Sequence, residues 1–197
     1  MKYFAVLLMI CMLTIAAVPV FAQNGQRSLN RGQNGRAQCR NLDVTQAPQQ
    51  LSAEEESWLL YMREEEKLAR DVYREFHEQY LLRIFTNIAA SEQRHFDALG
   101  QLIDRYGLTD PAQGEPGLFT NQDLQAAYDS LIEEGMESVL SALQVGVAIE
   151  EQDIIDLKAA ISESNSRDLV RVYSNLLNGS MNHLEAFESH IEVVTGQ

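Results

Sequence analysis

Apolar residues recur at helical spacing along most of the chain after residue 51. No segment shows the sustained alternation of period two that marks a strand. Ser52 and Glu55 form a capping-box pattern that predicts the start of the first helix, and Gly107 predicts the end of the second. The segment 107–121 carries two of the chain's four prolines and is predicted to be a long connection. The predicted helices span residues 52–80, 82–106, 122–134, 136–162 and 167–194.

The predicted fold class is therefore all-α. Four long helices form two pairs, and a long crossover connection that carries a short extra helix joins the pairs. In four-helix bundles this arrangement is typical of the ferritin-like folds.

Polar residues that fall in phase with the apolar positions are informative, because a bundle interior is normally apolar. Every long helix carries at least one such residue. Burying several carboxylates together is costly unless a cation compensates their charge. Carboxylate oxygens and neutral imidazole nitrogens bind iron or manganese in this manner. The candidate metal ligands are Glu66, Glu92, His95, Glu150, Asp153 and His183.

Some inward positions have competing candidates. Helical phase favours Glu66 over Glu65, and Glu150 over Glu151. Glu66 could instead form a pair with Arg70, four residues later on the same helix.

Other charged residues near these positions are predicted to lie outside the interior. Glu64 and Lys67 are expected to face solvent, while His77 and His190 are expected at the surface or at a bundle end. These four residues are therefore not candidate ligands.

Two glycines precede candidate ligands by one helical turn. Gly146 lies before Glu150, and Gly179 lies before His183. Glycine inside a helix costs about 1 kcal/mol relative to alanine, so a specific reason is expected. Room for a cluster of metal ligands, or a close approach of another segment, would supply that reason.

Three short segments resemble ligand motifs of the ferritin-like superfamily, and of the rubrerythrin-related proteins in particular. They are "EKLARDVY" (66–73), "SEQRH" (91–95) and "EEQD" (150–153). More closely, residues 52–190 resemble the bacterial and archaeal family catalogued as domain of unknown function 2202. The resemblance implies a ferritin-like fold with a metal site. Related di-iron proteins usually carry a glutamate three residues before the last histidine, where this chain has Ser180, and the rubredoxin-type cysteine cluster is absent.

The first functional hypothesis is an oxidoreductase with a di-iron or mixed iron and manganese centre that acts on O₂ or peroxide. Asp153 would be a sixth ligand or an acceptor for a histidine N–H. Tyr73 is the candidate catalytic phenol, and core packing is its alternative role. A metal-sequestering or interaction module without turnover is the second hypothesis. The third is a vestigial bundle in which the acids pair with Arg63, Arg70 and Arg94.

The N-terminal residues have a different character. Residues 1–22 have a charged start, a short apolar run and small residues before Gln23, which predicts a secretory signal cleaved after Ala22. The mature chain is therefore expected to be secreted or periplasmic, without stable membrane insertion. Residues 23–50 are rich in Gln, Asn, Gly and Arg and are predicted to form a disordered polar arm. The arm contains Cys39, the one cysteine left after cleavage, so an internal disulfide is excluded.

The predicted folded domain, residues 51–197, is strongly acidic. The whole chain has a formal charge of −14 and residues 1–50 contribute +4, which leaves −18 for this domain. Such a charge repels nucleic acid and anionic membranes and favours cations as partners. The sequence leaves a homodimer open.

Overall fold

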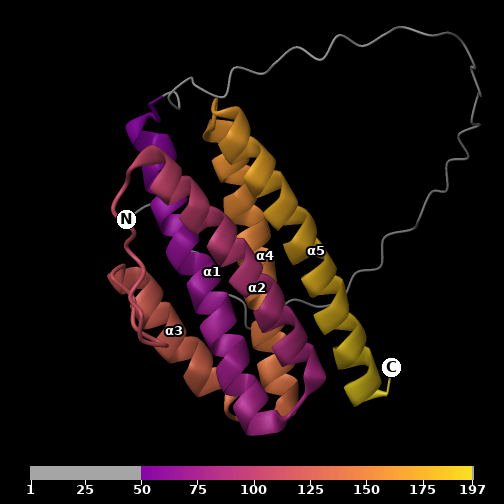
Figure 1. The fold of residues 1–197 in the computed structure, drawn as a ribbon. Coiled ribbons are helices and arrows are strands. Elements are labelled where there is room, and N and C mark those ends of the chain that lie inside the picture. Colours follow the sequence, from indigo (N-terminus) through magenta and orange to yellow (C-terminus); the bar gives the residue numbers. More distant parts are fainter. Residues whose placement is uncertain (1–49, 197) are drawn as a thin grey trace, which may run out of the picture. The chain divides into compact units, whose positions relative to one another are not determined.

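The computed structural model describes residues 50–196, and within this range the chain forms five α-helices and no strand (Figure 1). The predicted signal peptide, Cys39 and all but the last residue of the predicted arm lie outside the described residues. The all-α prediction is confirmed. The helices are α1 (Ala53–Tyr80), α2 (Arg83–Tyr106), α3 (Gln122–Gly135), α4 (Val139–Glu163) and α5 (Arg167–Thr195).

The ends of the helices follow local capping chemistry. Ser52 and Glu55 form the predicted capping box, with each side chain accepting the other residue's backbone N–H. Gly107 ends α2 in the left-handed conformation, as its position predicted. The largest discrepancy is at α4, which was predicted from residue 136. It begins at Val139 because Met136 still belongs to the end of α3 and the Ser138 side chain caps the new helix.

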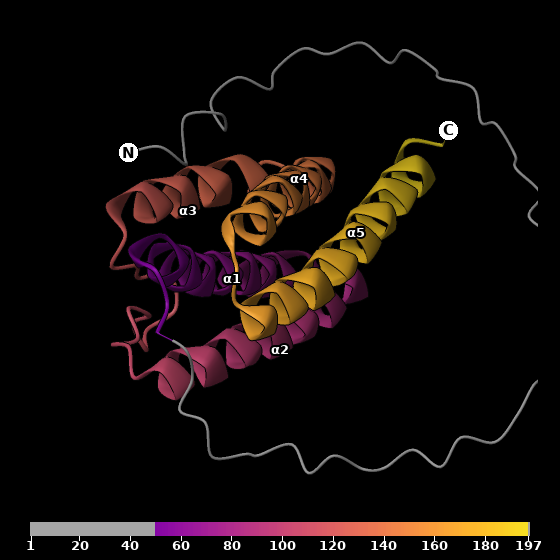
Figure 2. The same ribbon diagram turned by 90° about the horizontal axis from the view of Figure 1, so that it is seen from above.

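The helices pack as two pairs with α3 as an addition. α1 packs along α2, and α4 packs along α5. The two pairs contact each other through α1 with α4 and through α2 with α5, while α3 packs on α1 and α4. Figures 1 and 2 both show α1 between α2 and α3. Among the described helices, none combines the length and the apolar character needed to cross a membrane.

The central position of α1 explains an unusual burial pattern. Every residue from Tyr61 to Tyr73 is buried, although this stretch contains seven charged side chains. A helix with one solvated face would expose about half of them. Because α2, α4 and α3 all pack on α1, this stretch has no solvent-exposed face.

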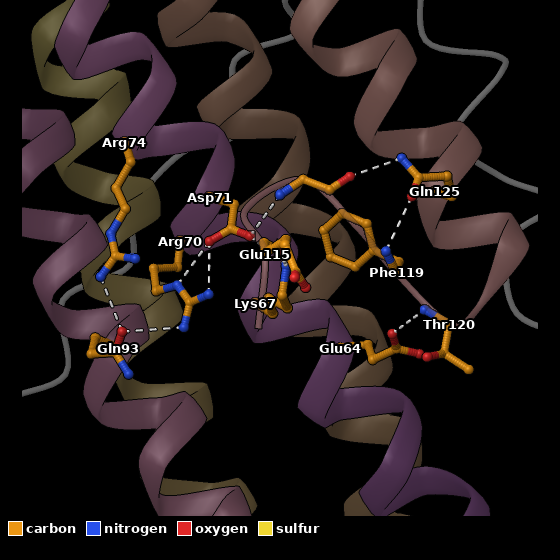
Figure 3. Close-up of polar contacts among 11 residues, drawn as sticks. Glu64, Lys67, Arg70, Asp71, Arg74, Gln93, Glu115, Phe119, Thr120 and Gln125 are labelled. Atoms are coloured by element: carbon orange, nitrogen blue, oxygen red, sulfur yellow. Dashed lines mark hydrogen bonds and ion pairs between the residues drawn. The ribbon is translucent and has the colours of Figure 1, made fainter. Parts of the chain in front are cut away.

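The prediction that Glu64 and Lys67 face solvent is wrong. Both are buried, because the connection between α2 and α3 covers this side of α1 (Figure 3). The Glu64 carboxylate accepts the backbone N–H groups of Thr120 at 2.6 Å and Asn121 at 3.0 Å. The Lys67 ammonium donates to Asp71 at 2.6 Å and to the Glu115 carbonyl at 2.9 Å. The prediction came from the periodicity of one helix, which gives no information on the connection that packs over that helix.

Asp71 completes the attachment of the connection. Its Oδ2 accepts the Gly117 N–H at 3.1 Å, and its Oδ1 accepts from the Arg70 guanidinium at 2.8 Å. Arg70 also donates to Gln93 of α2 at 3.1 Å (Figure 3). Arg70 is thus paired with Asp71 and Gln93, and the predicted alternative of a Glu66–Arg70 pair does not form.

Replacing Glu64 with alanine should destabilise the domain, since the substitution leaves two backbone N–H groups of the connection without their acceptor. An unsatisfied donor costs about 1–3 kcal/mol when it is buried, and these two hydrogen bonds are partly buried. We expect the free energy of unfolding in urea to fall by about 2 kcal/mol or more. Glu54→Ala, an exposed position on the same helix, is the control and should change it by less than about 0.5 kcal/mol. Equal stability of the two variants would contradict this role of Glu64.

Candidate metal centre

All six predicted ligands lie in the interior between the two helix pairs, five of them in two close groups and Asp153 outside both groups. Each long helix contributes, and the spacing of three residues in α2 and in α4 puts two ligands on one helix face. Five of the six are buried, and the His95 side chain is 12% exposed. The contributors are Glu66 from α1, Glu92 and His95 from α2, Glu150 and Asp153 from α4, and His183 from α5.

Glu92 lies at the centre of this arrangement. Its Oε2 is 2.7 Å from His95 Nδ1, and its Oε1 is 2.7 Å from His183 Nδ1. Glu66 Oε2 is 3.2 Å from the same His95 nitrogen, and Glu150 Oε2 is 3.5 Å from the His183 nitrogen. The result is two sets of candidate ligands that share Glu92, and in each set the atoms able to bind a metal lie within 4.8 Å of one another.

Several buried ligand atoms in these sets have no hydrogen-bond partner. Glu92 Oε1 and His183 Nδ1 are 2.7 Å apart, a contact that is an ion pair only when His183 is protonated, and neither atom has another hydrogen-bond partner. Glu66 Oε1 and Asp153 Oδ1 are likewise buried without a hydrogen-bond donor. Unsatisfied buried polar atoms are rare in folded proteins because each costs about 1–3 kcal/mol. A cation bound between such atoms would remove this cost.

Two hydroxyl groups fix the orientation of the α4 acids. The Tyr73 hydroxyl donates to Glu150 Oε1 at 2.7 Å, and the Tyr73 ring packs against Phe85 and Phe187. The Ser180 hydroxyl donates to Asp153 Oδ2 at 2.5 Å. In each acid, one carboxylate oxygen therefore accepts a hydrogen bond from a hydroxyl group, and the second oxygen takes no part in that bond.

The two glycines singled out from the sequence lie at close approaches. A Cβ at Gly179 would be 2.6 Å from the His95 ring, so the missing side chain makes room for a candidate ligand. A Cβ at Gly146 would be 2.6 Å from the Phe187 ring, so that glycine allows a core aromatic residue of α5 to approach α4. Only Gly179 therefore makes room for a ligand directly.

Comparison with known proteins assigns the chain to a family. Residues 55–197 match the family described as "Uncharacterized protein domain (DUF2202)". The chain belongs to the DUF2202 family. It is 44% identical over 146 residues to the protein MJ0754 of Methanocaldococcus jannaschii, which covers 73% of this chain and 79% of that protein. A crystal structure of MJ0754 is similar with a TM-score of 0.74 at 41% identity, covering 77% of this chain and 87% of that one.

In this DUF2202 chain burial separates Glu150 from Glu151 but does not separate Glu66 from Glu65. Glu151 is exposed, as helical phase predicted, and His190 is exposed as well. His77 is half-buried and lies 3.1 Å from the Leu82 carbonyl at the end of α1. Glu65 is buried like Glu66 but lies toward Asp156 of α4. Sequence reasoning missed that both neighbours are internal, because it assumed a single interior face.

The electrostatics of the metal-free cluster divide its groups into two kinds. Burial, and after it the charge of Glu92, raises the pKa of Glu150 to about 8, and burial raises the pKa of Asp153 to about 7. Burial would also raise the pKa of Glu92, but the neighbouring imidazoles lower it to about 2. Against the effect of burial, the carboxylates raise the pKa of His95 to about 11 and that of His183 to about 9. Without a cation, the groups with raised pKa values therefore tend to hold protons at neutral pH.

Gly179→Ala should lower stability even though alanine is the better helix former by about 1 kcal/mol. The new Cβ would collide with the His95 ring and displace it from Glu66 and Glu92. We expect a net loss of about 1–3 kcal/mol in urea unfolding, as for other overpacked interiors. Gly114→Ala, with no atom within 4 Å of the new Cβ, is the control and should be nearly neutral. A stabilised Gly179→Ala variant would show that the ring is not held at this position.

Protein treated with chelator should become less stable as the pH rises from 5 to 8. Glu150 and Asp153 have folded-state pKa values of about 8 and 7, above their unfolded values, so the folded chain binds more protons in this window. His95 and His183 act in the same direction above about pH 6.5. The expected decrease in the free energy of unfolding exceeds about 1 kcal/mol. Glu150→Gln should reduce the slope, and a flat profile in both proteins would contradict the assignment.

Proposed function

We propose that this DUF2202 chain is a ferritin-like protein that holds two metal ions, iron or manganese, and acts as an oxidoreductase on O₂ or peroxide. One ion would be held by Glu66, Glu92 and His95, and the other by Glu92, Glu150 and His183. Asp153 would be a further ligand or an acceptor close to the first set. In keeping with the signal expected in residues 1–22, the protein would act outside the cytoplasm.

The observation that carries the proposal is the pair formed by Glu92 Oε1 and His183 Nδ1. These atoms are buried and 2.7 Å apart, they have no other hydrogen-bond partner, and their contact is favourable only while His183 holds a proton. Two ligand atoms of one metal ion would be close together in the same way, with their lone pairs directed at the ion. Mixed carboxylate and imidazole donors from four helices are the ligands of iron and manganese in ferritin-like proteins.

The protein groups would have separate tasks around such a centre. Bound iron or manganese would supply the redox chemistry. Glu92, with one oxygen near each histidine, would keep the two positions together. Tyr73 would orient Glu150 by its hydrogen bond, and Ser180 would orient Asp153. Ser180 stands where related di-iron proteins carry a glutamate, and it has no carboxylate to bind a metal. A coordination position would therefore be left for O₂ or peroxide.

The two alternatives make different demands on the structure. A vestigial bundle needs the acids to pair with arginines, but Arg63 pairs with Asp110 and Arg70 with Asp71, while Arg94 is exposed. A metal-sequestering module without turnover would use the same ligands and differs only in its reactivity. Oxygen consumption on addition of ferrous iron to the metal-free protein separates it from an oxidoreductase.

Purified full-length protein should contain close to two metal ions per chain by elemental analysis, and ferrous iron should trigger oxygen consumption. His183→Ala should lower the affinity for the second ion at least tenfold, since it removes the only α5 ligand. His190→Ala, an exposed histidine on the same helix, is the matched control. Glu150→Ala and Glu151→Ala form a second matched pair on α4. Stoichiometric binding without oxygen consumption would favour sequestration, and equal metal content in all four variants would overturn the metal site.

A further inference from the structure

Two aromatic side chains of α1 donate hydrogen bonds to carboxylates of α4 near the end where α1 begins. The Trp58 N–H donates to Glu163 at 2.7 Å. Less than one turn later, the Tyr61 hydroxyl donates to Asp156 at 3.5 Å. The two rings are in edge-to-face contact, with their centroids 6.1 Å apart. Because Glu163 is exposed, whereas both rings and Asp156 are buried, the aromatic pair leads from a carboxylate in solvent to a carboxylate in the interior.

The same interface continues into the candidate metal centre. Further along α1, the Tyr73 hydroxyl donates to Glu150 of α4 at 2.7 Å. The order of the two tyrosine contacts shows that α1 and α4 run antiparallel, and Glu66 lies on α1 between Tyr61 and Tyr73. With a rise of about 1.5 Å per residue, Tyr61 is about 7.5 Å from Glu66 along the helix axis, and Trp58 is about 12 Å from it. The aromatic pair thus begins near solvent and ends less than two turns from a candidate ligand.

Both aromatic groups are suited to carry a single electron. An indole or a phenol gives up one electron more readily when a neighbouring base accepts its proton, and each of the two rings donates to a carboxylate. Burial, and after it the charges of Glu65 and Asp156, raise the pKa of Tyr61 above its usual range. The hydroxyl therefore keeps its proton at neutral pH, and its oxidation needs an acceptor such as Asp156. The chain has two cysteines, whereas an iron–sulfur cluster is usually held by four, so aromatic side chains are the better candidates for carrying electrons within it.

We propose that Trp58 and Tyr61 form an electron relay from a soluble one-electron reductant outside the protein to the candidate metal centre. The relay rests on the proposed function, which supplies the oxidant, hydrogen peroxide. In the first step Tyr61 gives one electron to the oxidised centre and its hydroxyl proton to Asp156. In the second step Trp58 gives one electron to the Tyr61 radical, Asp156 returns the proton, and the indole N–H proton passes to Glu163. The reductant then gives one electron to the Trp58 radical, and Glu163 returns its proton.

Each passage moves one electron inward and leaves the four side chains as they were. Two passages supply the two electrons that one peroxide molecule takes up, with two protons from water, to form two water molecules. The point of electron entry is the end of α4 where the exposed Glu163 accepts the Trp58 N–H.

The exchange between the two rings can be measured without metal, because Trp58 is the only tryptophan of the chain. Pulse radiolysis of chelator-treated full-length protein in azide solution removes one electron from Trp58. The absorption of the tryptophanyl radical should then decay while that of a tyrosyl radical grows, at a rate independent of protein concentration. Since the same two groups exchange the electron in either direction, this rate measures their coupling.

Matched substitutions identify the groups that take part. Tyr61→Phe keeps the ring but removes the hydroxyl, and it should abolish the growth of the tyrosyl radical. Tyr80→Phe is the control and should leave the rate unchanged, since Tyr80 is the last residue of α1 and its hydroxyl donates to α3. Asp156→Asn should lower the rate about a hundredfold, as expected for the loss of a positioned proton acceptor. Glu151→Gln, at an exposed position of α4, should not change it.

Two outcomes of this measurement would overturn the relay. One is a tyrosyl radical that grows at the same rate in Tyr61→Phe as in the unmodified protein. The other is a tryptophanyl radical that does not pass to tyrosine in the unmodified protein. Circular dichroism checks helix content, and if either Tyr61→Phe or Asp156→Asn does not fold, the other decides.

Iron-loaded protein separates the relay from the proposed function. When Trp58→Phe is mixed with hydrogen peroxide without a reductant and rapidly frozen, its electron paramagnetic resonance spectrum should show a tyrosyl radical. Adding Tyr61→Phe should remove that signal, and peroxide consumption without the signal in Trp58→Phe would overturn the relay. A protein that binds no iron and consumes no peroxide, but passes the electron between the two rings when metal-free, would contradict the proposed function and not the coupling of the pair.

Discussion

The burial of charge along α1 is the constraint on which the other features depend. Between Tyr61 and Tyr73 this helix carries seven charged side chains, and all of them are inside the protein. Removing a charge from water costs several kcal/mol unless a partner compensates it. The elements around α1 supply partners on some sides of the helix and not on others, and this difference determines where buried acids are left without a full set of partners.

On the side of α1 that faces the connection and α3, compensation is complete within the protein. Lys67 and Asp71 form an ion pair and bind backbone groups of the connection, and Glu64 accepts two of its N–H groups (Figure 3). On the side of α2, Arg70 donates to Gln93. These contacts explain how a long segment with little regular structure is held against a helix rich in charge.

On the sides that face α4 and the two histidines, compensation is incomplete. Glu66 and Glu65 meet further carboxylates there, and the available positive charge is limited to imidazoles that could bind a proton or a metal. The Ser180 hydroxyl of α5 donates a hydrogen bond to Asp153 of α4. The shortage of positive charge thus lies in one region, which is also the region where buried carboxylate and imidazole atoms have no hydrogen-bond partner.

The sequence by itself determined the helical class, the five helices to within a few residues, and the six residues that converge in the interior. It could do so because helical periodicity and capping are local, and because a polar residue in an apolar phase stands out on each helix separately. Only the tertiary structure decided that α1 is covered on all sides, so that Glu64, Glu65 and Lys67 are buried as well as Glu66. It also decided which partner each charge finds, since the pairing of Asp71 with Lys67, Arg70 and Gly117 depends on the path of the connection between α2 and α3. Periodicity records which residues share a face of one helix, but it carries no information on how many other elements pack around that helix.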